Sequence, residues 1–309
     1  MQVVSSIHEL YEAGFKRVSI ACGNFDGLHL GHRKIIDQLL VAAKESNSEP
    51  VVLTFSPHPR LVLTGKQFPI LAPMKTKVRL FEALGVKAII NINFTKEFAS
   101  QTASDFVKNV LLQEGLEVRD ICVGSDWRFG SGREGNVEFL KDKLWGFKVY
   151  PIAELEDSDE FISSSRIRTA LAENDFVLTK KLLGRDYSVR GKVVQGAGIA
   201  TKQLNYPTAN VDVQEQCLPL AGVFACCVAV GDQPKLHNAV CNIGSAPTFN
   251  DSQKMKVEVH LLDYSGNLYG EELEIFFMQF LRSEKKFSCA DELKKQISND
   301  VAKAREIFE

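Results

Sequence analysis

Five short apolar runs in the first half of the chain alternate with helical patterns, and this alternation constrains the fold most strongly. Rich in β-branched residues, the runs cover 17–22, 50–56, 86–92, 120–126 and 146–152. Continuous apolar runs of this length are typical of strands buried on both faces of a sheet. Helical patterns lie between them at 31–45, 75–84, 103–114 and 134–143. The alternation therefore predicts a parallel sheet with right-handed helical crossovers.

The pattern changes near Gly184, which is a plausible C-cap for the second of two short helices within 164–184. Strand-like runs separated by turns follow at 187–196, 222–230, 237–244, 255–264 and 272–282. They predict a compact antiparallel unit, most simply a β-barrel. The last stretch is an amphipathic helix with an apolar side formed by Leu293, Ile297, Val301 and Ile307. We expect an α/β domain over 1–185 and a barrel domain with a terminal helix over 186–309.

Composition excludes several classes of partner for this chain of 309 residues. The net charge is −2, and neither half is basic enough to suggest binding to a nucleic-acid backbone. The longest apolar run, 222–230, is too short to cross a bilayer, and no signal-peptide pattern opens the chain. Seven scattered cysteines without a CxxC pair argue for reduced thiols. We expect a cytoplasmic protein without nucleic-acid or membrane partners, and no sequence signal fixes an oligomeric state.

The segment "GNFDGLHLGH", residues 23–32, is the first candidate site. It follows the first predicted buried strand, so it lies at the carboxyl edge of a parallel sheet, where such folds bind ligands. Its glycines permit close approach of the backbone, and the start of the next helix offers free N–H groups to an anion. His29 and His32 are one helical turn apart and can point to the same side. A phosphate site, a metal site with Asp26 as a third ligand and a simple glycine-rich turn all remain open here.

A second motif, "ISSSRIR" at 162–168, favours the phosphate interpretation. Ser164 or Ser165 would cap a helix, and Arg168 falls on the same side one turn later. Capping explains the serines but does not explain two arginines in this position. Because guanidinium groups bind phosphate with two parallel hydrogen bonds, the motif suits a nucleotide triphosphate.

Together, these two motifs resemble those of the nucleotidylyltransferase superfamily. "TFSPHP" (54–59) and "VGSDWRFG" (123–130) are similar to the flavin adenylyltransferase module of prokaryotic bifunctional FAD synthetases. The resemblance implies a Rossmann-like sheet that transfers AMP from ATP to FMN. It assigns catalysis to His29 and His32. It assigns binding of nucleotide or flavin to Asn24, Phe25, Asp26, Gly27, Pro57, His58, Asp126, Ser164, Ser165 and Arg168.

The second candidate site lies in the predicted barrel. In "PTAN", Thr208 and Asn210 alternate with apolar neighbours, so their oxygens can point the same way and suit Mg²⁺. In "MKVEVHLLDY" (255–264), Glu258 and His260 share the polar face of a strand. From spacing alone, a solvated turn and a solvated strand face are the favoured explanations of these residues.

The order of motifs across 183–287 is similar to that of the riboflavin kinase domain, a small β-barrel with a terminal helix. The motifs are "LGRDY", "GKVVQG", "PTAN", "NIGSAPTF", "EVHLLDYSGNLYG" and "FLRSEKKF". The resemblance implies that Thr208 and Asn210 hold Mg²⁺ with ATP, that Glu258 is the general base and that Arg282 lines the flavin pocket. The chain departs from the family pattern at Lys202, which replaces an arginine, and at Asn205, which replaces a glycine.

The two resemblances together imply a bifunctional enzyme of flavin cofactor synthesis. It would phosphorylate riboflavin to FMN with ATP and then adenylylate FMN to FAD, with Mg²⁺ serving both steps. Riboflavin, FMN and ATP would be its small-molecule partners. Two alternatives remain at this point: a transferase whose barrel is a degraded flavin binder, and a flavin sensor without turnover.

Overall fold

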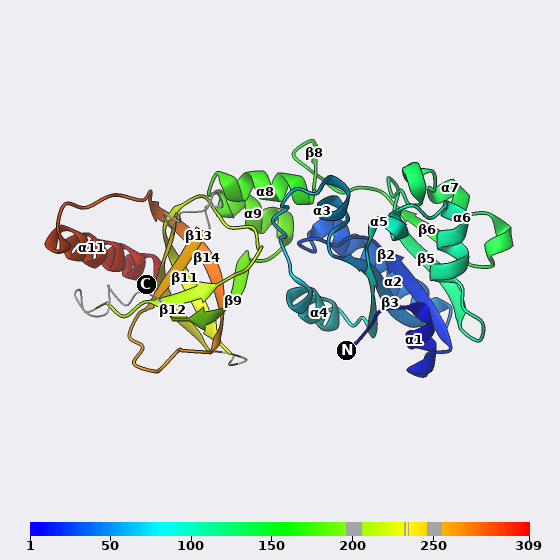
Figure 1. The fold of residues 1–309 in the computed structure, drawn as a ribbon, viewed down its shortest axis with the longest axis horizontal. Helices are drawn as coiled ribbons and strands as arrows, with labels where there is room; N and C mark the ends of the chain where they lie inside the picture. Colours follow the sequence, from blue (N-terminus) through cyan, green and yellow to red (C-terminus); the bar gives the residue numbers. More distant parts are fainter. Residues whose placement is uncertain (196–205, 232, 234, 246–254) are drawn as a thin grey trace. The chain divides into compact units, whose positions relative to one another are not determined.

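The computed structural model describes residues 1–195, 206–231, 233, 235–245 and 255–309 (Figure 1). Lys202 and Asn205 lie outside the described residues. The chain divides into two compact units, Met1–Ser164 and Ser165–Glu309. A domain boundary between 185 and 186 stays a prediction.

The first unit is built on a six-stranded parallel sheet in the order β1-β4-β3-β2-β5-β6. All five predicted strands form, which confirms the parallel α/β class. The additional strand, β1, is only three residues long and shows no periodicity in the sequence. The strands are β1 (Gln2–Val4), β2 (Arg17–Cys22), β3 (Glu49–Ser56), β4 (Ala88–Asn93), β5 (Glu117–Gly124) and β6 (Lys148–Ile152).

Helices cover both faces of this sheet (Figure 1). The helix α2 (Leu30–Glu45) packs Ile36 and Leu39 on one face, together with Phe81 of α4 (Met74–Ala83). The helices α1 (Ile7–Glu12), α6 (Ala103–Phe106) and α7 (Val137–Leu140) bury apolar residues on the other. The sheet strands contribute side chains to both cores, so they are buried on both faces and their sequences are unbroken apolar runs.

Two predicted helices are shorter or less regular than expected. The segment predicted as 103–114 forms α6 and then a π-helical turn, Val107–Leu111. The segment predicted as 134–143 is helical only in α7, because Asn136 caps it by accepting a hydrogen bond from the N–H of Phe139 at 2.9 Å. Short elements complete the unit: α3 (Pro59–Thr64), α5 (Lys96–Ala99), 3₁₀ turns at Ser131–Arg133 and Lys143–Trp145, and the pair β7 (Glu156–Asp157) and β8 (Glu160–Phe161).

The second unit is a closed antiparallel barrel in the order β10-β13-β12-β11-β14-β9, which confirms the predicted barrel. It follows the two predicted helices, α8 (Ser164–Ala172) and α9 (Phe176–Leu183), and Gly184 ends α9 in the left-handed conformation, as expected of a C-cap. The strands are β9 (Ser188–Val194), β10 (Ala209–Asp212), β11 (Gly222–Val230), β12 (Leu236–Ser245), β13 (Met255–Leu261) and β14 (Glu272–Arg282).

Alternation along the barrel strands separates two apolar faces. Phe224 and Phe277 are fully buried and meet edge to face at 5.4 Å, with Phe176 of α9 stacked on Phe277. On the opposite face of β11, Val223 and Ala225 pack against the terminal helix α11 (Ala290–Phe308). The helix α11 therefore covers one side of the barrel, as its apolar stripe predicts (Figure 1). Among the described residues, no helix has the length and apolar character needed to span a bilayer.

Candidate functional site

The strand order reverses between β2 and β5, and this switch point locates the first site. The strands that follow β2 in sequence, β3 and β4, lie on one side of it, and β5 and β6 lie on the other. Open α/β sheets bind ligands at the carboxyl ends of the strands that flank such a point. The loop after β2 carries the predicted residues of 24–32, and the loop after β5 carries Asp126. The structure therefore brings the loop after β2 and the loop after β5 to one edge of the sheet.

The backbone of the loop after β2 is held in an uncommon conformation. Phe25, Gly27 and Leu28 all have positive φ, at 48°, 81° and 41°. Residues other than glycine rarely adopt this region and need surrounding structure to hold them there. Phe25 and Leu28 are both buried, and a Cβ at Gly27 would lie only 2.9 Å from a side-chain carbon of Leu71. Packing thus fixes the loop in a shape that the bare turn would not keep.

Asp26 braces this loop from inside the protein. Its side chain is only 2% exposed, and Oδ1 accepts hydrogen bonds from the N–H groups of Leu71 at 2.9 Å and Ala72 at 3.1 Å. Its backbone carbonyl accepts a hydrogen bond from Oγ of Ser164 at 2.8 Å. Asp26 thus ties the loop to residues 71–72 and to Ser164, and its role in a binding loop stays a prediction.

The two histidines form a stacked pair at the start of α2. Nδ1 of His29 accepts a hydrogen bond from the N–H of His32 at 3.3 Å, and the ring centroids lie 3.6 Å apart. Because Nδ1 of a neutral His29 is an acceptor, its proton resides on Nε2, which is then a donor. Burial, reinforced by His29 and Lys77, holds the pKa of His32 well below its usual range. At neutral pH His32 is therefore a neutral imidazole.

Lys77 is a site residue that the sequence did not reveal. It lies on α4 and is only 6% exposed; its Nζ donates to the backbone carbonyl of Asn24 at 2.6 Å and to Oγ1 of Thr54 at 3.5 Å. Burial lowers the pKa of Lys77 to about 8, although the carboxylate of Asp26 opposes the shift. A lysine within an amphipathic helix pattern ordinarily indicates a solvated position, so no local signal could have identified this one.

The neighbouring strand ends carry the predicted flavin side. Pro57 and His58 follow β3, and Nδ1 of His58 caps α3 by accepting the N–H of Arg60 at 3.1 Å. Buried and half-buried aromatic rings gather at the ends of β3, β4 and β5, with centroid separations of 4.7–6.2 Å between neighbours. Because these rings come from five separate segments, their clustering could not be predicted from the sequence; they are Phe55, Phe94, Phe98, Phe106, Trp127 and Phe129.

Two of the predicted phosphate ligands fall on the other side of the division between the units. Ser164 is the last residue of the first unit, whereas Ser165 and Arg168 belong to the second. All three lie on α8, and Arg168 follows Ser164 by about one helical turn. The placement of Ser165 and Arg168 beside the histidines stays a prediction.

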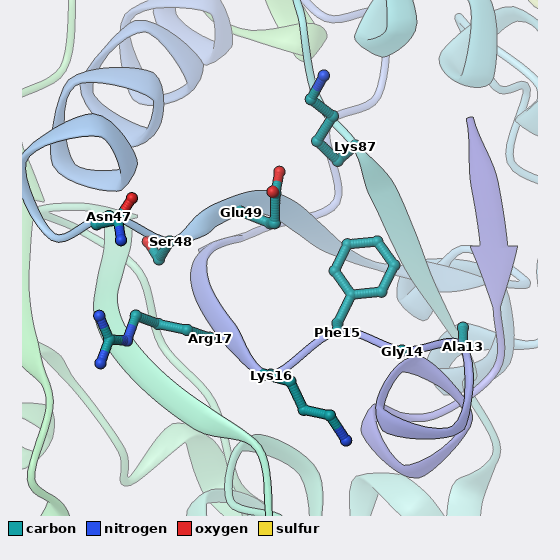
Figure 2. A pocket seen from close by; sticks show the side chains of 9 residues that line it. All are labelled: Ala13, Gly14, Phe15, Lys16, Arg17, Asn47, Ser48, Glu49 and Lys87. Atoms are coloured by element: carbon teal, nitrogen blue, oxygen red, sulfur yellow. The ribbon is translucent and has the colours of Figure 1, made fainter.

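A pocket of about 670 Å³ lies at the opposite edge of the sheet, and Figure 2 shows its side chains. Its walls come from the residues that precede or begin β2, β3 and β4, among them Lys16, Glu49 and Lys87. These positions are at the amino ends of the strands, away from the switch-point loops. None of the predicted site residues lines this pocket, so its volume does not identify it as the site of the reaction.

In the barrel, Glu258 lies between two asparagines on adjacent strands. The register pairs Glu258 of β13 with Asn210 of β10 on one side and with Asn242 of β12 on the other. Directly paired residues point to the same face, so the three polar side chains form a row across the barrel. Val257 and Val259 are buried on the opposite face, which confirms the predicted alternation. Asn242 lies 16 positions from Glu258 and was not identified from the sequence.

The segment before β10 is fastened to the same face. Nδ1 of His260 lies 2.8 Å from the carbonyl oxygen of Pro207, and the His260 ring meets Tyr206 edge-on. Since a carbonyl can only accept, Nδ1 carries the proton. Thr208 follows directly, two residues before Asn210. Among the described residues, the side chain of Glu258 has no hydrogen bond or ion pair, and no three His, Cys, Asp or Glu side chains converge as metal ligands.

Arg282 is bound to the terminal helix. Its Nε and a terminal nitrogen contact the carboxylate of Asp300 on α11 at 2.8–3.0 Å, and the Asp300 side chain is almost completely buried. This ion pair anchors α11 to the end of β14. A position of Arg282 in a flavin pocket stays a prediction.

Comparison with known proteins identifies the family. A family model described as FAD synthetase matches residues 12–166, and one described as riboflavin kinase matches residues 183–308. A bifunctional riboflavin kinase/FMN adenylyltransferase of Buchnera aphidicola subsp. Schizaphis graminum is 36% identical over 313 residues, covering 100% of this chain and 99% of that protein. The chain belongs to the bifunctional riboflavin kinase/FMN adenylyltransferase family.

Other relatives agree with this membership over the whole length. The bifunctional riboflavin kinase/FMN adenylyltransferase of Escherichia coli K12 is 34% identical over 312 residues, covering 100% of this chain and 98% of that protein. A solved structure described as a macrolide-efflux protein from Streptococcus pneumoniae superposes with a TM-score of 0.84 at 27% identity, covering 98% of both chains. The switch-point loops fall inside the FAD synthetase match, and Glu258 falls inside the riboflavin kinase match.

Proposed function

We propose that this chain catalyses two successive reactions: riboflavin and ATP give FMN and ADP, and then FMN and ATP give FAD and pyrophosphate. The observation that carries the proposal is the pairing of two different sites with two family matches. One site offers two stacked histidines at a helix start, and the other offers a carboxylate between two amides. A sensor or a chain with a degraded barrel would not require both.

Adenylyl transfer in the first unit needs charge neutralisation rather than a base. The attacking group is the phosphate of FMN, which is already an anion at neutral pH. Nε2–H of His29, His32 and the N–H groups at the start of α2 would donate to the phosphates of ATP as charge shifts towards the leaving pyrophosphate. Ser164, Ser165 and Arg168 would hold the triphosphate. The fixed loop around Asp26 orients the reactants, which supplies much of the acceleration in such a site.

The remaining residues of the first unit would divide between the two substrates. Asn24, Phe25, Asp26 and Gly27 would form the wall of the adenine nucleotide site, with Asp126 facing them from the loop after β5. Pro57 and His58 would line the flavin side. Of the aromatic rings beyond them, the half-buried Trp127 would offer a flat apolar surface that suits the isoalloxazine ring.

Phosphorylation in the barrel needs a base because an alcohol is a weak nucleophile. Glu258 would accept the proton of the ribityl 5′-hydroxyl while that oxygen attacks the γ-phosphorus of ATP and ADP leaves. Thr208 and Asn210 would supply the hard oxygen ligands that Mg²⁺ prefers, and Asn210 is paired directly with Glu258. When bound, Mg²⁺ would neutralise charge on the ATP phosphates. Arg282 would lie at the edge of the flavin pocket.

Two further features fit a kinase domain over 186–309 in a reducing compartment. Lys202 retains the positive charge of the arginine it replaces, and Asn205 tolerates positive φ better than other residues except glycine. All seven cysteines are free thiols, as expected in the cytoplasm.

The decisive experiment is incubation of the full chain with riboflavin and Mg-ATP, followed by chromatography of the flavins. We expect FMN first and FAD later. Glu258→Ala should abolish FMN formation and leave conversion of added FMN to FAD intact. The double variant His29→Ala, His32→Ala should have the reverse effect. If the wild-type protein leaves both riboflavin and added FMN unchanged, the result would instead indicate a sensor. If it converts added FMN to FAD but does not phosphorylate riboflavin, the result would indicate a degraded barrel.

A further inference from the structure

A buried ammonium group lies directly beneath the candidate nucleotide loop. Nζ of Lys77 donates to the carbonyl of Asn24, the residue before Phe25, where the loop first adopts a positive φ. Oγ1 of Thr54 donates to the same carbonyl at 3.1 Å. The carbonyl of Asn24 would therefore keep a hydrogen-bond donor if the lysine were absent. Hydrogen-bond satisfaction alone does not explain a lysine here.

The surroundings of Lys77 do not explain its charge as part of a structural ion pair. The charged and titratable groups that face it are Asp26 of the loop and His32 of α2. Oδ1 of Asp26 accepts hydrogen bonds from two backbone N–H groups, and His32 stacks on His29. Among the described residues, the ammonium of Lys77 contacts a carbonyl and a hydroxyl and forms no ion pair with a carboxylate. Burial of an ammonium without a dedicated counter-ion is unfavourable. The positive charge is thus a feature of the site that the fold itself does not require.

We propose that Lys77 is a positioning residue for adenylyl transfer, which holds the Asn24 carbonyl and places a fixed positive charge behind the His29–His32 pair. The inference rests on the proposed FMN adenylyltransferase function. The held carbonyl fixes the start of the loop that approaches the nucleotide. The buried charge favours the ATP phosphates on the far side of the histidines, where little water screens it.

The reaction makes this charge useful throughout the transfer. The new bond joins an FMN phosphate oxygen to the α-phosphorus, the bridging bond between the α- and β-phosphates breaks, and pyrophosphate leaves with the electron pair. Negative charge grows on the leaving group and no proton has to move. A fixed cation that needs no reorganisation stabilises such a change.

The test compares Lys77→Met with Lys77→Arg and with a matched control, Lys44→Met, at an exposed position in the last turn of α2. FAD formation from FMN and FMN formation from riboflavin are measured on the same preparations. We expect Lys77→Met to lower kcat/KM for FAD formation by roughly 10- to 100-fold, because Lys77 acts from behind the histidines and a donor in direct contact with the reacting atoms contributes roughly 100- to 1000-fold. Lys77→Arg should recover part of the loss. Riboflavin phosphorylation should be unchanged in all three variants.

The wild-type pH profile supplies a second readout that needs no variant. FAD formation should fall as the pH rises through about 8, where Lys77 loses its proton, while FMN formation shows no matching loss. In Lys77→Met this limb should vanish. A wild-type protein that makes no FAD would overturn the proposed function and the inference together. The inference alone would be overturned if the wild type makes FAD and Lys77→Met keeps full activity. It would also be overturned if FAD formation by the wild type does not decline as the pH rises through about 8.

Discussion

Replacement of Lys77 by methionine should make the first unit more stable while it impairs FAD formation. Burial lowers the pKa of Lys77 from 10.5 to about 8, a difference of about 2.5 units. At roughly 1.4 kcal/mol per unit, the charged lysine costs the folded state on the order of 3 kcal/mol. Loss of the hydrogen bond from Lys77 to the Asn24 carbonyl lowers the stability of the variant by only about 1 kcal/mol, because Thr54 still donates to that carbonyl. The net gain at pH 7 is about 2 kcal/mol.

The sign of the pH dependence follows from the direction of the shift. The unfolded chain binds the lysine proton more tightly than the folded protein does, so the cost is fully present below pH 8. It declines as the pH rises from about 8 towards the unfolded value of 10.5. The advantage of Lys77→Met over the wild type should therefore shrink between pH 7 and pH 10.

Calorimetry or urea unfolding, followed through the transition of the first unit, measures this difference. For a unit of this size, 2 kcal/mol corresponds to a rise in Tm of roughly 4–8 °C. Lys44→Met, at an exposed position, should lie within about 0.5 kcal/mol of the wild type at both pH values. Destabilisation of Lys77→Met at pH 7, or a gain of equal size at pH 7 and pH 10, would refute the reasoning.

Three further substitutions test other parts of the two sites. Asp26→Ala leaves two buried N–H groups without an acceptor, so urea unfolding should show a loss of about 2–3 kcal/mol, and FAD formation should fall more than tenfold. Asp300→Ala leaves the guanidinium of Arg282 without its partner and should destabilise the barrel unit by about 3 kcal/mol in the same assay, with FAD formation from added FMN unchanged. Asn242→Ala removes a neighbour of Glu258 and should reduce kcat for FMN formation several-fold, measured by steady-state kinetics.

The sheet strands were predictable because each is buried on both faces, which leaves a continuous apolar run in the sequence. The strand β13 was predictable for the opposite reason, since one face is buried and the other carries Glu258 and His260. Elements of three to six residues, such as β1, α3 and β10, were missed because a period cannot be recognised over so few positions. Their formation depends on neighbours that are distant in the chain.

The candidate site residues also divide into those that the sequence predicted and those that it could not predict. The loop with His29 and His32 was visible because its glycines, its histidines and the helix start are contiguous. Lys77 joins it from 53 positions beyond Asn24, and Asn242 reaches Glu258 only through strand pairing. A lysine on a helix and an asparagine on a strand carry no local mark of function. Only the tertiary structure buries Lys77 and places Asn242 next to the proposed base.

The two sites also differ in how much unfavourable structure they contain, and the difference follows from their chemistry. The loop of the first site contains two left-handed residues other than glycine, at roughly 1–3 kcal/mol each, above a buried ammonium. In the barrel, Asn210, Glu258 and Asn242 lie on regular strands with paired backbones. A reaction that requires no proton transfer depends on a rigid arrangement of donors and charge, which costs folding stability. A reaction that requires a base can place one carboxylate on a strand at little cost. Stabilising substitutions should therefore be concentrated in the first loop, and they should reduce FAD formation before they affect FMN formation.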